Sequence, residues 1–228
     1  MNDHKVFDFI DHIYVINLDK RPERWEKCKE ELKESGIGLE NVERFSAVNG
    51  YDHPAADKID LVDAYGNPDK APGNLGCILS HLKAYEDADE RGFEGILMLE
   101  DDVVFANDFT WRFENYSQQI PNDWQFVYFG GNNNEEPKSF KPNLKICETT
   151  WATHSYMIRP AYRNKIIKRV YKSGFEEPID NIYGGIQNDL DFYIFDPRIT
   201  IQREGFSDIV GADRNYDHVL KDEEVEFR

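Results

Sequence analysis

Short apolar runs alternate with amphipathic segments along most of the chain. Residues 13–18 (IYVINL) are nearly all apolar and β-favouring, which is typical of a strand covered on both faces. In residues 22–36 (PERWEKCKEELKESG) apolar positions recur at helical spacing, with Pro22 suited to the first turn and Gly36 to the end. Residues 42–48 (VERFSAV) predict a second strand. This order predicts a βαβ unit with parallel strands and a right-handed crossover.

The same alternation continues beyond this unit and predicts an α/β fold with a mostly parallel sheet. Residues 49–74 differ, because they are rich in Asp, Pro, Gly and Asn and carry a weak strand signal only at 58–66. A connection this long is usually functional or mobile. The polar residues 212–228 are expected to form a tail. Further helices are predicted at 76–92, 108–119 and 160–173, and further strands at 95–99, 124–131, 153–158 and 191–195.

Length and composition fit one soluble domain spanning residues 1–228. No apolar run approaches the roughly 20 residues that a membrane helix needs, and the N-terminus has no secretory signal pattern, so a cytoplasmic location is expected. The net charge of -17 repels nucleic acid. Three widely spaced cysteines, Cys28, Cys77 and Cys147, without a CxxC pair, argue against a disulfide framework and a structural zinc site.

The most informative polar cluster interrupts an apolar segment. Glu100, Asp101 and Asp102 lie between the run 95–99 and the apolar VVF at 103–105. Ligands of an open parallel sheet gather at the carboxyl ends of its strands, which is where these side chains should lie. Three adjacent carboxylates repel one another, and a divalent cation relieves the repulsion, Mg²⁺ or Mn²⁺ suiting oxygen ligands best. The alternative is a solvated acidic turn.

A complementary cluster follows the first predicted strand. The segment NLDKRPER brings Asn17, Asp19, Arg21 and Arg24 to a strand end and a helix start. Guanidinium groups and helix N-termini both bind anions. A metal at one strand end and this cluster at the other would form a diphosphate clamp. In the alternative interpretation, the two arginines pair with glutamates on the helix surface.

Six motifs occur in one order: INLDKRPERW, GCILSH, LMLEDDV, THSYMI, EPIDN and QREGFSDI. Over roughly residues 12–211 the chain therefore resembles glycosyltransferase family 25, which holds lipooligosaccharide galactosyltransferases and the galactosyltransferase domains of procollagen-modifying enzymes. The resemblance implies a GT-A-like three-layer α/β/α sandwich with a mostly parallel, Rossmann-like central sheet. It also implies a DxD-like motif binding Mn²⁺ (or Mg²⁺) and a UDP-sugar donor.

The resemblance also implies roles for particular residues. Asp102 is expected to ligate the metal, Glu100 to face the ribose or a metal-bound water, and Asp101 to point the other way. Asp208 is expected to be a further metal ligand or to hold its turn. The remaining donor-site residues implied are Asn17, Asp19 and Arg21 around the uridine, and Ser80 and His81, which approach the donor from the helix before the metal strand. The alternative for His81 is a hydrogen bond to the backbone.

The resemblance further implies inversion at the sugar carbon, with a carboxylate accepting the proton of the attacking hydroxyl. Asp180 in EPIDN is the preferred base, with Asp189 as a second candidate, and the alternative role for Asp180 is a helix N-cap. Trp151 is a candidate for stacking on a sugar. The connection 49–74 or the C-terminal tail is a candidate lid that excludes water.

The acceptor and the donor sugar are the features that carry over least well from the family to this chain. The chain departs from the family pattern at His154 and at 181–190 (NIYGGIQNDL), where the acceptor should bind. The expected reaction moves a hexose, galactose before glucose, to a hydroxyl of a glycan or of a hydroxylysine-type protein acceptor. The alternatives are an inactive UDP-sugar or carbohydrate-binding module of the same fold and, last, a metal-dependent phosphohydrolase.

Overall fold

The computed structural model describes residues 9–54, 71–175, 177–187, 189–209, 211–216 and 222–227. The strand signal at 58–66 and most of the candidate lid at 49–74 lie outside these residues. The helices are α1 (Pro22–Glu34), α2 (Ala71–Glu90), α3 (Phe109–Ser117), α4 (Pro160–Ser173) and α5 (Ile179–Gln187), with 3-10 turns at Leu39–Asn41 and Gly50–Asp52. The main-sheet strands are β1 (His12–Asn17), β2 (Val42–Ser46), β3 (Ile96–Glu100), β5 (Phe126–Tyr128), β7 (Lys138–Lys141), β8 (Leu144–Ile146), β10 (Ser155–Ile158) and β11 (Phe192–Phe195).

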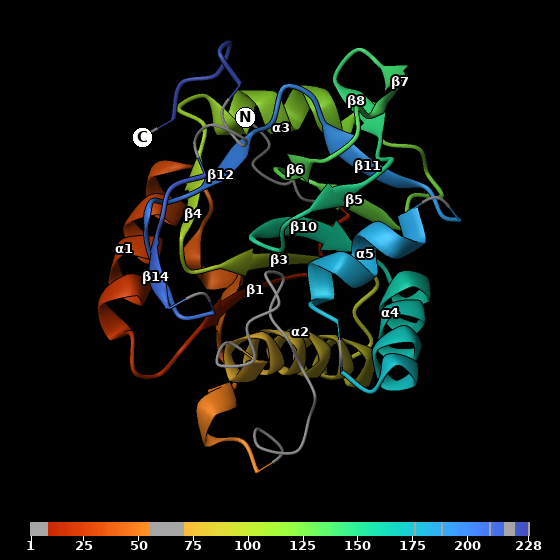
Figure 1. The fold of residues 1–228 in the computed structure, drawn as a ribbon. Helices are drawn as coiled ribbons and strands as arrows, with labels where there is room; N and C mark the ends of the chain where they lie inside the picture. Colours follow the sequence, from red (N-terminus) through yellow and green to blue (C-terminus); the bar gives the residue numbers. More distant parts are fainter. Residues whose placement is uncertain are drawn as a thin grey trace.

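These eight strands form one mixed sheet in the order β2-β1-β3-β10-β5-β11-β8-β7 (Figure 1). The predicted βαβ unit is confirmed, because β1 runs parallel to β2, with Ile13 opposite Val42, and also to β3. β5 and β11 are parallel to each other, whereas β10 is antiparallel to both β3 and β5. The β8 strand also runs against its neighbour β11. The sheet is therefore mostly, but not wholly, unidirectional.

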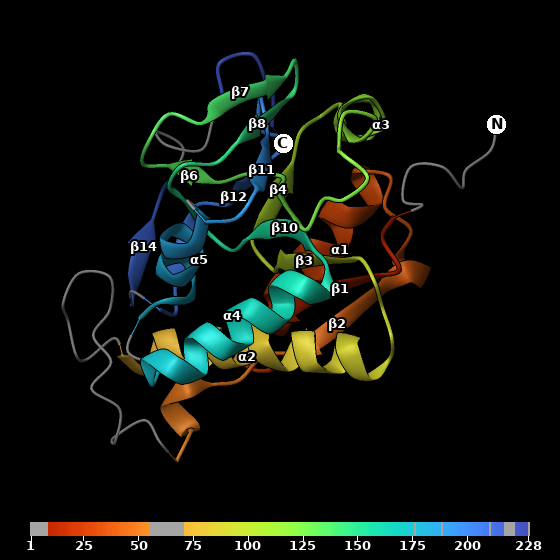
Figure 2. The same ribbon diagram turned by 90° about the vertical axis from the view of Figure 1, so that its right-hand side faces the viewer.

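Helices cover both faces of the sheet. Figure 2 shows α2 and α4 together on one side and α1 and α3 on the other. The alternation of side chains along β1 explains this, since Tyr14 and Ile16 enter the core cluster beneath α2 and α4, while Ile13 and Val15 enter the one beneath α1 and α3. A strand buried on both faces is expected to be apolar along most of its length, as residues 13–16 are. The three-layer α/β/α prediction is confirmed.

The segment 95–105 does not form one strand. β3 ends at Glu100, Asp101 and Asp102 form a turn, and the following strand β4 (Val103–Phe105) leaves the main sheet to pair antiparallel with β12 (Thr200–Gln202). The two short pairs β6 (Asn132–Asn133) with β9 (Thr150–Trp151), and β13 (Gly205–Ser207) with β14 (Ala212–Arg214), had no sequence signal that predicted them. The carboxylates thus occupy a turn where the chain changes sheet.

The described part of the C-terminal tail packs on the body of the domain. The Asp222 carboxylate accepts hydrogen bonds from the backbone and side chain of Arg198, both at 2.6 Å. Phe227 packs against Val104 and Ile201. Among the helices within the described ranges, none combines the length and apolarity required to cross a membrane.

Arg163 links helices α2 and α4. Its side chain is fully buried, and it donates to Asp89 at 2.5 and 2.8 Å and to the carbonyls of Phe93 and Glu94 at 2.6 and 3.2 Å. Removing one partner of such a pair leaves a buried charge uncompensated.

We predict that Asp89→Ala lowers the free energy of unfolding by about 3 kcal/mol, because it leaves the buried charge of Arg163 without its carboxylate partner. Urea denaturation measures this loss. The control is Glu90→Ala, an exposed neighbour on the same helix, which should cost less than about 0.5 kcal/mol. Equal losses in the two variants would contradict this role of Asp89.

Candidate functional site

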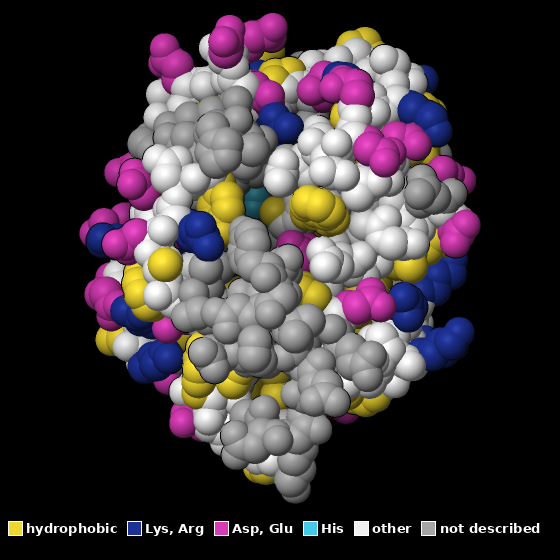
Figure 3. Space-filling model, in the orientation of Figure 1, with side chains coloured by type: hydrophobic (Ala, Val, Ile, Leu, Met, Phe, Trp, Pro, Cys, Tyr) yellow, Lys and Arg dark blue, Asp and Glu magenta, His cyan; other side chains and the backbone are white. Residues whose placement is uncertain are grey.

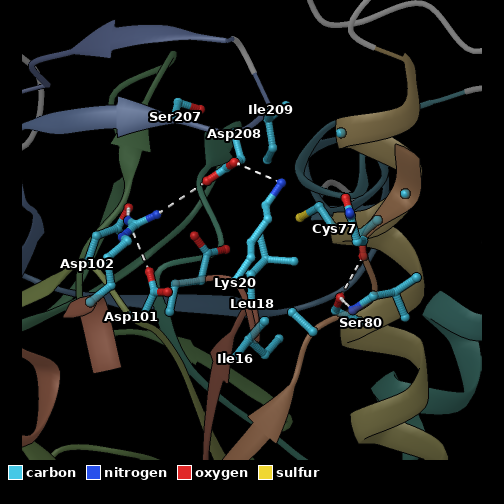
Figure 4. A pocket seen from close by; sticks show the side chains of 18 of the residues that line it. Ile16, Leu18, Lys20, Cys77, Ser80, Asp101, Asp102, Ser207, Asp208 and Ile209 are labelled. Atoms are coloured by element: carbon cyan, nitrogen blue, oxygen red, sulfur yellow. Dashed lines mark hydrogen bonds and ion pairs between the residues drawn. The ribbon is translucent and has the colours of Figure 1, made fainter. Parts of the chain in front are cut away.

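A cavity lies at the carboxyl ends of β1, β2 and β3, between these strands and α2. Figure 3 shows this side of the molecule in space-filling form, with acidic and basic side chains interspersed over its surface. In Figure 4, Asp101 and Asp102 lie on one wall with Asp208 and Lys20 nearby, and Cys77 and Ser80 lie on the opposite wall. The structure brings six of the predicted site residues into this cavity: Ser80, His81, Glu100, Asp101, Asp102 and Asp208.

Arg24 forms ion pairs with both aspartates of the carboxylate turn. Its Nη2 lies 3.0 Å from Asp101 Oδ1 and 2.8 Å from Asp102 Oδ2, and Gln202 donates to the same Asp102 oxygen at 3.1 Å. Burial, with the nearby charge of Glu100, nevertheless raises the pKa of Asp102 to about 7. Burial also raises the pKa of Asp101. One guanidinium therefore compensates the two aspartates only in part.

One oxygen of this turn is left without a partner. Asp102 Oδ1 is buried and accepts no hydrogen bond from the residues that the structure describes. A buried carboxylate oxygen without a donor is costly, and such atoms call for an explanation such as an absent ion. Its position on the cavity wall makes this oxygen a candidate metal ligand.

Asp208 reaches the cavity from the segment after β13. It accepts hydrogen bonds from Arg21 at 3.2 Å to each of its oxygens, and Lys20 Nζ lies 3.3 Å away. Burial opposes ionisation, but the hydrogen bonds and charges of these two cations keep the pKa of Asp208 below its usual value. The structure thus gathers basic side chains beside the acidic turn.

Glu100 belongs to a different network. Its Oε1 accepts a hydrogen bond from Thr153 Oγ1 at 2.5 Å and lies 3.4 Å from His81 Nε2. His81 Nδ1 is in turn 2.6 Å from the hydroxyl of Tyr156, which also bonds to Tyr85. Burial works against the charged form, yet the partners His81 and Thr153 lower the pKa of Glu100. Glu100 is therefore held as a carboxylate in a fixed orientation.

The cluster at the end of β1 is an internal brace. Asn17 donates to Asp101 at 2.6 Å and to the Arg21 carbonyl at 3.1 Å, and it accepts from Arg44 Nε at 2.7 Å. Its amide has no donor left for a ligand. Asp19 is exposed and bonds to Arg44 at 2.7 Å. Asn17 and Asp19 do not line the cavity, and Arg21 lines an adjoining one behind Asp101 and Asp102.

Ser80 joins the loop after β2 to α2. Its hydroxyl donates to the Gly76 carbonyl at 2.6 Å and accepts from the backbone N–H of Val48 at 2.8 Å. A Cβ on Gly76 would come within 2.6 Å of the Val48 carbonyl, so only glycine permits this approach of helix and loop. Ser80 therefore holds the loop after β2 against α2 and so shapes the cavity wall.

One candidate base lies on α5 and the other lies beyond its end. Asp180 lies in the first turn, accepts from the N–H of Asn181 at 3.0 Å, and has its pKa raised by burial and by the charge of Glu100. Asp189 follows the helix and is exposed. Neither lines the cavity that holds the carboxylates. Glu100, whose charge contributes to the raised pKa of Asp180, does line this cavity.

Two further residues singled out in the sequence lie in structural positions. The Trp151 indole packs on α5, where a Cβ on Gly184 would meet its Nε1 at 2.9 Å. His154 is 1% exposed, and neither ring nitrogen has a hydrogen-bond partner among the described residues. Burial lowers the pKa of His154 to about 4. His154 does not line the cavity.

A family model described as "Glycosyltransferase family 25 (LPS biosynthesis protein)" matches residues 10–183. The chain belongs to glycosyltransferase family 25. The matched region contains β1, α2, the carboxylate turn and Asp180, but not Asp208. Family membership predicted from the six motifs is thereby confirmed.

Relatives in this family carry different names. The human protein "Inactive glycosyltransferase 25 family member 3" is 29% identical over 172 residues, covering 69% of this chain and 28% of that protein. Procollagen galactosyltransferase 1 of Danio rerio is 28% identical over 157 residues, covering 64% of this chain and 26% of that protein. The chain thus matches under a third of the length of these relatives.

A solved glycosyltransferase involved in the glycosylation of the major capsid of PBCV-1 has a TM-score of 0.49 and 11% sequence identity. The match covers 86% of this chain and 94% of that one. The family assignment does not depend on this comparison.

Several residues that contact the side chains of the cavity are not marked by the sequence pattern. Thr153 and Gln202 lie inside the motifs THSYMI and QREGFSDI, so the motifs marked the right segments without identifying the contacting side chains. Arg44 sits on a half-buried strand, and no local pattern shows that its side chain reaches Asn17. These contacts depend on strand register, which the local pattern alone does not give.

The buried His154 predicts a pH dependence of stability. Its folded pKa of about 4 lies below the unfolded value of 6.5, so the unfolded chain binds the proton more readily. We expect this group's contribution to be complete above pH 6.5 and to be lost as the pH falls toward 4, by about 3 kcal/mol in total. The measurement is the free energy of unfolding across this range for the wild type and His154→Leu. A constant difference between the two proteins would contradict the prediction.

Proposed function

We propose that this family 25 chain is a metal-dependent, inverting glycosyltransferase that moves a galactosyl group from a UDP-sugar to a hydroxyl of a glycan or hydroxylated protein. One observation carries the proposal: Glu100, Asp102 and Asp208 line one cavity at the strand ends, and Asp102 presents a buried oxygen without a partner. The choice of galactose follows relatives named procollagen galactosyltransferases.

Three carboxylates that line the cavity are candidate ligands for a divalent cation. Asp102 and Glu100, with Asp208 as a third candidate, offer the oxygen ligands that Mn²⁺ and Mg²⁺ prefer. Burial and, after it, the charge of Glu100 raise the pKa of Asp102, and a bound cation would relieve the repulsion between these carboxylates. When bound, the ion would neutralise charge on the departing diphosphate and act as a Lewis acid.

The walls of the cavity suit a nucleotide diphosphate. Ile16, Leu18 and Tyr51 supply apolar and aromatic surface for a base, while Lys20 and Arg24 supply cations for phosphate groups. In a chain with net charge of -17, this local supply of cations offsets the general repulsion of an anionic donor. We therefore assign the donor to this cavity, with Lys20 and Arg24 nearest its diphosphate.

Asp180 is our candidate for the base. Burial raises its pKa, which increases its affinity for the proton of an attacking hydroxyl. It lies in the first turn of α5, and we propose that the acceptor binds near this helix and attacks the sugar from the side opposite the diphosphate, as inversion would require.

A test of the donor site is UDP release from a panel of UDP-sugars with Mn²⁺ present or chelated. We expect one sugar to give metal-dependent release and Asp102→Asn to lower it at least about 100-fold, because the substitution removes a metal ligand. Asp123→Asn, which changes an exposed carboxylate outside the cavity, is the matched control. Release that persists unchanged with chelator would sink the metal assignment.

The base assignment is tested by Asp180→Asn, with donor affinity measured alongside turnover. We expect turnover to fall about 10²- to 10⁴-fold and the Kd for UDP-sugar to stay within about twofold, since the base acts only in the transition state. The same assay on Asp189→Asn tests the second candidate. Near-normal turnover in Asp180→Asn, with a large loss in Asp189→Asn, would transfer the role to Asp189.

A second candidate function is a UDP-sugar-binding module without turnover. Two observations favour it: a human relative is named inactive, and Arg24 already pairs with both aspartates of the turn. Such a module would bind UDP in the presence of Mn²⁺ yet release none from any UDP-sugar. The assay above therefore separates the two functions.

A further inference from the structure

One group of side chains in the cavity combines a thiol, an imidazole and a carboxylate, and the proposed carboxylate metal site does not use the first two. Cys77, His81 and Glu100 each direct a possible ligand atom to the same point, and these atoms all lie within 4.8 Å of one another. Cys77 and His81 are four residues apart on α2, so they share one face of the helix. Glu100 meets them from the end of β3. In Figure 4 the Cys77 sulfur points into the cavity.

The distances fit a tetrahedral ion. Bonds of about 2.0 to 2.3 Å place neighbouring ligand atoms roughly 3.3 to 3.8 Å apart. His81 Nε2 and Glu100 Oε1 are already 3.4 Å apart. Because no separation within the group exceeds 4.8 Å, closure around an ion requires a movement of at most about one ångström.

The surrounding hydrogen bonds orient two of the ligands beforehand. Tyr156 OH lies 2.6 Å from His81 Nδ1 and can hold the proton there, which leaves Nε2 free to ligate. Thr153 Oγ1 bonds to Glu100 Oε1 and fixes that carboxylate. Outer partners of this kind orient the ligands of protein metal sites.

We propose that Cys77, His81 and Glu100 form a binding site for a thiophilic divalent cation of the zinc class, with a fourth position open to the cavity. A thiolate and an imidazole favour Zn²⁺ over Mn²⁺ or Mg²⁺, which prefer oxygen. One thiolate and one carboxylate balance the charge of the ion. The ligands come from two elements of the fold and involve one cysteine, so no cysteine pair marks the site in the sequence.

Glu100 is shared with the donor-metal site proposed above. Zn²⁺ bound here would take that carboxylate and fill part of the cavity, so it would compete with the donor. This consequence rests on the proposed function, whereas the binding site itself does not.

The test is titration of the metal-free protein with Co²⁺, followed by displacement with Zn²⁺. We expect one equivalent of Co²⁺ to give a thiolate-to-cobalt charge-transfer band and intense tetrahedral d–d bands, because cobalt adopts the geometry of zinc. Cys77→Ser should abolish the charge-transfer band, whereas Cys147→Ser, which changes a buried core cysteine, should retain it. A band that survives Cys77→Ser, or no stoichiometric band in the wild type, overturns the proposal.

A second measurement needs no substitution. In the wild type, Zn²⁺ should slow alkylation of Cys77 by iodoacetamide at least about tenfold, read peptide by peptide, without the same change at Cys28 or Cys147. Equal rates at Cys77 with and without Zn²⁺ would refute the site. Donor turnover enters neither measurement, so failure of the transferase proposal would leave both results interpretable.

Discussion

The electrostatic balance of the turn between β3 and β4 is the constraint on which the site depends. Asp101 and Asp102 carry like charges into a buried position, and Arg24 from α1 lies within 3.0 Å of both. Asn17 from β1 and Gln202 from β12 supply the remaining hydrogen bonds. Three separate elements are thus fixed by the need to compensate one turn, and Asp102 Oδ1 remains available for a cation.

A second network connects this turn to the other half of the sheet. Glu100 lies against His81 of α2, which bonds to Tyr156 of β10, and the Tyr156 hydroxyl lies 3.1 Å from that of Tyr183 in α5. These groups are buried, so each hydrogen bond must be satisfied internally. The helix that carries Asp180 is therefore fixed relative to the carboxylate turn.

Much of the fold could be predicted because strands that are buried on both faces of the sheet have continuous apolar runs in the sequence. Residues 13–16 are apolar at four consecutive positions because β1 has a core cluster on each side. The reversed direction of β10 leaves no such pattern, since a buried strand looks alike in either direction. Short pairs such as β6 with β9 bury too little apolar surface to impose a pattern.

The sequence by itself determined the approximate strand ends, the position of the acidic turn and the family. These features follow from patterns among neighbouring residues and from the order of the motifs. Only the tertiary structure decided which groups meet: Arg24 with Asp102, Arg44 with Asn17, and Cys77 with Glu100. Those pairs are separated by tens of residues and are set by strand register and helix packing. Their chemistry follows from long-range contacts, which local patterns do not encode.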